Sequence, residues 1–169
     1  MPPTRQRPAF DADQRTALLG WYDLQRGIVV MKCDGLSEAD ARRSVIPGSP
    51  LMTVAGIVSH LTWAEQLWFE HAFLGREPDG PGWDGVEDSE FQVGDRSFSQ
   101  VLASYDAQCR RSDEVLAAHD LDEQGVGGQF PSAGSTLGWM LLHMLEETAR
   151  HAGHLDLVRE LLDGETGYY

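Results

Sequence analysis

Apolar residues recur at three- and four-residue steps along four long stretches of the chain, whereas the alternation typical of strands is weak throughout. The stretches cover about residues 11–33, residues 53–74, a third segment that begins near Ser97, and residues 135–163, for which Ser135 is a good N-cap. Four helices of roughly 20 residues each predict an all-α fold, a four-helix bundle.

The connections between these stretches are long. Glycine and proline are dense in residues 75–96 and 119–134, and a short helix is expected over residues 37–43. Such long inter-helix loops predict a bundle that departs from the simplest up-and-down arrangement. Acids are dense in residues 75–95, and we expect this loop either to cover a functional site or to serve as a plain linker.

Length and composition narrow the classes of function open to the chain. The chain has 169 residues with 13 basic and 27 acidic side chains, a formal net charge of −14. This length predicts one domain, residues 11–169, after a flexible N-terminal arm, residues 1–10. The excess of acids argues against a nucleic-acid or anionic-membrane partner, and no apolar run resembles a membrane span or a signal peptide.

Cys33 and Cys109 form no disulfide framework, so we expect packed core thiols in a cytoplasmic protein.

The histidines of the last predicted helix carry the main chemical signal. With His143 at zero and a rotation of about 100° per residue, Glu147 lies near 40°, His151 near 80° and His154 near 20°. The apolar stripe of this helix lies at about 100–160°, so Glu147 and His151 border the core more closely than the other two. On the second helix, His60 also lies at the edge of an apolar stripe.

Two imidazoles and a carboxylate form a plausible set of metal ligands. The i,i+4 spacing of Glu147 and His151 places both side chains on one helix face, one turn apart, and His60 supplies a third donor. Three protein ligands leave a coordination position open for water or substrate, which is the catalytic pattern. The same residues also allow a bland interpretation, in which Glu147 pairs with Arg150 or is solvated and the histidines are ordinary hydrogen-bonded side chains. The spacing leaves both open.

The residues around these positions resemble a known family. The segment Val58–Glu65, which contains His60, and the block Leu142–Glu160, which contains Glu147 and His151, are similar to the DinB/YfiT-like superfamily. The resemblance covers nearly the whole chain in helix order and spacing. It implies a four-helix bundle, often a homodimer, in which His60, Glu147 and His151 hold a divalent metal. Many members use three histidines, whereas the related mycothiol-dependent maleylpyruvate isomerases use a His, Glu, His set of this kind.

The resemblance also implies an activity. A two-His, one-carboxylate site suits zinc, nickel, iron or manganese. A metal there would bind a low-molecular-weight thiol such as mycothiol, lower its pKa and present it to a small electrophile, as in an S-transferase or isomerase. The alternatives are a metal-dependent hydrolase, a non-catalytic metal-binding bundle in the stress response, and a structural bundle whose histidines bind no metal.

Other side chains are candidates for supporting roles. No dedicated general base is evident, and His154 and His143 are the nearest candidates. Arg150 is a candidate contact for an anionic substrate, and Trp63 is either a core residue or an aromatic wall at the mouth of a pocket. Of the 27 acids, Glu147 is the only one that we expect to be withdrawn from solvent.

Overall fold

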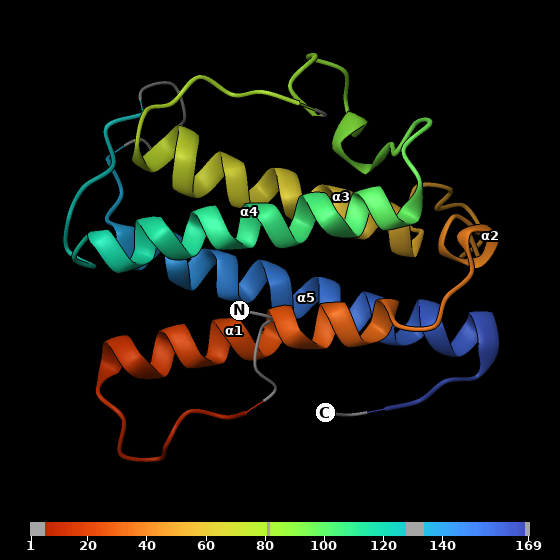
Figure 1. Cartoon of the computed structure of the whole chain (residues 1–169), viewed down its shortest axis with the longest axis horizontal. Helices are drawn as coiled ribbons and strands as arrows, with labels where there is room; N and C mark the ends of the chain where they lie inside the picture. Colours follow the sequence, from red (N-terminus) through yellow and green to blue (C-terminus); the bar gives the residue numbers. More distant parts are fainter. Residues whose placement is uncertain (1–5, 81, 128–133, 168–169) are drawn as a thin grey trace.

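Four long helices lie roughly parallel along the longest axis of the molecule (Figure 1). The computed structural model describes residues 6–80, 82–127 and 134–167, so part of the predicted N-terminal arm, residues 1–5, lies outside the described residues. Within this part of the chain the structure contains no strand, which confirms the all-α prediction. The helices are α1 (Gln14–Cys33), α2 (Glu38–Ala41), α3 (Val54–Glu65), η1 (Gln66–Phe73), η2 (Ser89–Phe91), α4 (Phe98–Ala118) and α5 (Leu137–Asp163).

The packing of the bundle pairs helices that are distant in sequence. Helix α1 packs mainly against α5, and α3 packs mainly against α4 and also contacts α5. The apolar core forms two clusters along the bundle, and both cysteines are buried in it or beside it, as predicted from the sequence. None of the described helices is long and apolar enough to cross a membrane.

Local capping fixes most helix ends. The hydroxyl of Thr53 accepts a hydrogen bond from the main-chain N–H of Gly56. Ser97 and Gln100 form a reciprocal capping box at the start of α4. Gly164 ends α5 in the left-handed region, with φ of 75°. These three ends agree with the sequence prediction because each depends on residues within about one turn of the boundary.

The predicted N-cap of the last helix is wrong by one residue. Thr136 caps α5 and accepts a hydrogen bond from the N–H of Trp139. The carbonyl of Ser135 instead accepts a hydrogen bond from the N–H of Gly125, which lies in the preceding loop. Ser135 therefore belongs to the loop–loop contact rather than to the helix.

The second long helix changes its hydrogen-bonding pattern halfway along. It is α-helical to Glu65 and continues as a π-helix, η1, over Gln66–Phe73. A π-helix has i→i+5 hydrogen bonds, so the 100° helical wheel places residues correctly only as far as Glu65. Nδ1 of His71, inside η1, lies 2.8 Å from the carbonyl oxygen of Arg76.

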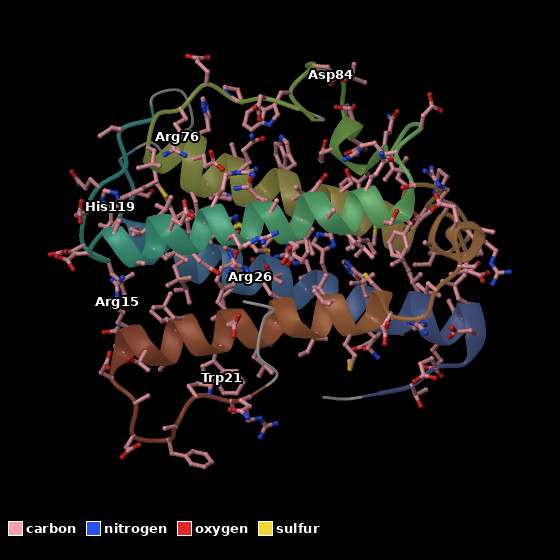
Figure 2. The ribbon with its side chains drawn as sticks, in the orientation of Figure 1. Arg15, Trp21, Arg26, Arg76, Asp84 and His119 are labelled. Atoms are coloured by element: carbon pink, nitrogen blue, oxygen red, sulfur yellow. The ribbon has the colours of Figure 1, made fainter. Side chains whose placement is uncertain are left out.

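A buried ion pair joins α1 to α3. Arg26 extends from α1 toward α4 (Figure 2), and its Nε and Nη2 donate to Glu65 at 2.7 and 2.6 Å. The hydroxyl of Tyr22 donates to the same carboxylate at 2.6 Å. The expectation that Glu147 is the only acid withdrawn from solvent is therefore wrong, since Glu65 is 0% and Glu70 8% exposed. Partners on neighbouring helices offset the cost of burying these charges.

Candidate metal centre

The three side chains predicted as metal ligands meet between α3 and α5. Nε2 of His60 lies 3.0 Å from Oε1 of Glu147, and Nε2 of His151 lies 3.2 Å from the same oxygen. One donor atom from each residue lies within 4.8 Å of the others, and the His60 and His151 ring centroids are 4.8 Å apart. The side chains are 11%, 14% and 8% exposed for His60, Glu147 and His151. The structure thus brings together a pair on one helix and a residue from a helix 87 positions away in sequence.

The carboxylate at the centre of this group is held in its charged form. Hydrogen bonds with His151 and then His60 hold the pKa of Glu147 well below its usual range, and they outweigh the opposing effect of burial. Nη1 of Arg150 contacts the other oxygen of this carboxylate at 3.1 Å. The helical wheel is consistent with the structure here, since His151 is buried and Glu147 is largely covered.

The acidic loop covers this site with its η2 turn. The ring of Phe91 stacks face to face on His60, with centroids 4.2 Å apart and an interplanar angle of 6°. The turn lies close against α3 at Gly56, where an added Cβ would lie 3.0 Å from the main-chain oxygen of Phe91. The loop of residues 75–95 was expected either to cover a functional site or to serve as a plain linker. Its η2 segment covers the cluster.

The remaining candidate residues lie at different distances from the cluster. Nδ1 of His154 lies 3.4 Å from Nδ1 of His151, and burial, followed by the charge of His151, lowers the pKa of His154. The ring of Trp63 lies 5.9 Å from that of His60. Arg150 is about half exposed and contacts Glu147. This is the pairing that the sequence allows as an alternative to metal binding.

His143 lies apart from this group. Its ring stacks on Trp139 at 5.5 Å and meets the edge of Trp68 at 4.7 Å. Trp139 is 48% exposed, so this aromatic group is partly at the surface. Among the described residues, no hydrogen bond, ion pair or ring contact joins His143 to the three central side chains.

Glu90, which no motif in the sequence marks as a site residue, approaches the cluster from η2. Its Oε1 lies 3.6 Å from Nδ1 of His60, and its side chain is 15% exposed. Glu90 is one of many acids in the loop, and neither spacing nor periodicity distinguishes it from the others. The one usable signal is its position next to Phe91, one of the few apolar residues in a mostly polar segment.

The donor set fits a divalent cation of the transition series. Two imidazole nitrogens and one carboxylate oxygen suit zinc, nickel, iron and manganese. The carboxylate-to-imidazole separations of 3.0 and 3.2 Å are close to the roughly 3.4 Å between ligand atoms on a tetrahedral zinc with bonds of about 2.1 Å. Modest side-chain adjustments would therefore place all three donors around one ion.

The architecture and this cluster define a four-helix bundle of the DinB-like type. A family model described as mycothiol S-transferase matches residues 17–164, and the chain belongs to this DinB-like family. The match confirms the resemblance seen in the sequence. The family indicates a function like that of mycothiol S-transferases, with a small-molecule substrate. Among curated proteins, no match to the chain was found.

Proposed function

We propose that this protein is a divalent-metal-dependent S-transferase, in which His60, Glu147 and His151 hold the metal. Its co-substrate is mycothiol or a similar low-molecular-weight thiol, and its substrate is a small electrophile. The observation that carries this proposal is the convergence of three suitable donors in a chain of the mycothiol S-transferase family.

A cation held by these residues would supply Lewis acidity that favours ionisation of a bound thiol near neutral pH. The chain's own residues prepare the site for it. Glu147 is ionised and provides a negative charge next to two imidazoles. The ring of Phe91 covers one face of His60 and keeps water from that side. Three protein donors leave at least one coordination position open for a thiol, a substrate or water.

Two further side chains are suited to contact the substrate. Trp63 lies beside His60 and offers an apolar face for the electrophile. Arg150 lies at the exposed edge of the cluster, where a guanidinium can contact an anionic group of a substrate. His154 lies against Nδ1 of His151, which suits a role in orienting that ring better than a role as general base.

Metal analysis tests the ligand set. Protein purified without an affinity tag is analysed by elemental mass spectrometry, alongside His151→Ala and the control His119→Ala. The His119 side chain pairs with Glu123 by a contact of 2.9 Å and is not part of the cluster. We expect stoichiometric metal in the wild type and the control and a large loss in His151→Ala. Equal metal content in all three proteins would refute the site.

Thiol-consumption assays test the reaction. Mycothiol is mixed with chlorinated and epoxide electrophiles, and free thiol is followed over time with metal-loaded and chelator-treated protein. We expect consumption that depends on the metal and is abolished in His151→Ala. Metal binding without turnover across the panel would instead support the non-catalytic metal-binding bundle.

A further inference from the structure

One ring nitrogen at the cluster has no hydrogen-bond partner. Nδ1 of His60 is buried, and among the described residues none donates to it or accepts from it. The nearest carboxylate oxygen is Oε1 of Glu90, 3.6 Å away, too far for a hydrogen bond. The opposite nitrogen, Nε2, is the one that faces Glu147 and the other donors. Glu90 therefore lies on the side of the ring that faces away from the metal-ligand group.

The missing partner of Nδ1 matters because metal binding requires a particular tautomer of His60. A neutral imidazole that offers the Nε2 lone pair to a cation carries its proton on Nδ1. In His151 that nitrogen has a neighbour, Nδ1 of His154, at 3.4 Å. In His60 the N–H would be buried without an acceptor unless Glu90 moved closer. A buried donor without an acceptor is unfavourable, so the ligating form of His60 requires a partner.

The η2 turn is built to place a carboxylate there. Its Ser89 hydroxyl donates to Oδ1 of Asp84 at 2.6 Å, and Asp88, just before the turn, has a positive φ of 58°. Phe91, the next residue along, stacks on the same His60 ring. Among the described residues, the ion-pair contact of Glu90 is with His60, and no arginine or lysine holds its carboxylate elsewhere.

We propose that Glu90 is a positioning residue of the metal centre: its carboxylate accepts the Nδ1–H of His60 and thereby fixes the tautomer and ring orientation in which Nε2 binds the cation. The 3.6 Å separation shortens to about 2.8–3.0 Å, a movement of less than an ångström. The role of Glu90 rests on the proposed function, because it presupposes that His60 binds a metal. It makes η2 a part of the metal centre rather than a passive cover.

Zinc affinity tests this role. Zinc dissociation constants are measured by competition with a chromophoric chelator for the wild type, Glu90→Gln, Glu90→Ala and the control Glu87→Gln. Glu87 lies in the same loop and is exposed, so its substitution removes the same charge without touching His60. Loss of a carboxylate that orients a metal-binding histidine weakens affinity by about 10–100-fold. We expect that loss in Glu90→Ala, a smaller loss in Glu90→Gln, whose amide oxygen still accepts, and none in Glu87→Gln.

A second measurement reads the tautomer directly. Proton–nitrogen spectra of the zinc-loaded protein, labelled at histidine, identify which His60 nitrogen carries the proton. We expect a slowly exchanging Nδ1–H in the wild type that exchanges faster in Glu90→Ala, while thermal unfolding of the metal-free variants stays near that of the wild type. Unchanged zinc affinity in both Glu90 variants, or zinc bound through Nδ1 of His60, would overturn the role of Glu90. Failure of the wild type to bind any of zinc, nickel, iron(II) and manganese would instead refute the proposed function.

Discussion

Replacing Arg26 by methionine isolates the energetics of the buried ion pair. The side chains of Arg26 and Glu65 are 2% and 1% exposed, and the guanidinium donates to both carboxylate oxygens. Burial disfavours the charged guanidinium, but the charge of Glu65 and the lesser interactions with Tyr22 and Cys109 together outweigh burial and raise the pKa of Arg26 well above its ordinary value. In Arg26→Met the carboxylate keeps the Tyr22 hydroxyl and the weak Cys109 thiol contact at 3.7 Å, and no cation.

The expected loss of stability in Arg26→Met follows from the contacts that remain around Glu65. Removing one partner of a buried ion pair costs about 3–5 kcal/mol, because the other charge stays buried without compensation. Asp113, which accepts from Nη1 of Arg26 at 2.6 Å, is 56% exposed, so the loss of that contact adds at most about 1 kcal/mol. In a chain of this size each kcal/mol lowers Tm by roughly 2–4 °C, so a total cost of about 3–6 kcal/mol predicts a fall of roughly 6–24 °C. The double variant Arg26→Met/Glu65→Leu should recover most of it, because it leaves no buried charge.

Urea unfolding followed by circular dichroism measures these differences. The wild type, both single variants and the double variant form a double-mutant cycle in metal-free buffer, so that metal binding does not contribute. A loss below about 1 kcal/mol in Arg26→Met would refute the reasoning, because it would mean that water or another group compensates Glu65. A double variant no more stable than Arg26→Met would show that the cost is lost packing rather than an uncompensated charge.

Three further outcomes are expected. Free zinc at 100 times its dissociation constant should stabilise the wild type by about 2.7 kcal/mol and leave the stability of His151→Ala unchanged. Calorimetry measures this, and equal zinc-induced Tm shifts in the two proteins would contradict the site. Gly56→Ala should cost about 1–3 kcal/mol in urea unfolding, because the new Cβ would lie 2.5 Å from the main-chain oxygen of Leu51; wild-type stability would be inconsistent with this close contact. Burial raises the pKa of Glu70, but hydrogen bonds led by that from Arg111 outweigh it, so the folded pKa lies below 4.5. The stability that Glu70 contributes is present above the unfolded pKa and is lost as pH falls through the folded value, so Glu70→Gln should lose less stability on acidification than the wild type; equal losses would exclude this linkage.

The positions of the helices were predictable because their signals are local. Thr53 and Ser97 cap helices with side chains that bond within one turn, and the apolar stripes repeat inside each segment. The π-helical form of η1 was not predictable, because i→i+4 and i→i+5 bonding need no distinct composition over eight residues. The exact start of α5 depended on a contact between Ser135 and Gly125 across the loop.

The candidate site was predictable where one helix holds its residues. Glu147 and His151 follow from the i,i+4 rule. Periodicity placed His60 at the edge of an apolar stripe and made it a candidate third donor, but a helical face does not identify its partner, and the family resemblance supplied that. Glu65 left a signal that was not used: it lies about 140° from His60 on the helical wheel, on the apolar side. Glu90 left almost none, because the path of a long loop is set by packing against distant residues.

The burial of both cysteines has a chemical consequence for the proposed reaction with electrophiles. Cys33 is 3% exposed and burial raises its pKa to about 12, while burial and then the charge of Glu65 raise the pKa of Cys109 well above its ordinary value. Alkylation requires an accessible thiolate, which neither side chain provides in the folded protein. Under the proposed function, this burial protects the polypeptide from covalent modification by an electrophilic substrate and leaves the small thiol without a competing protein thiol.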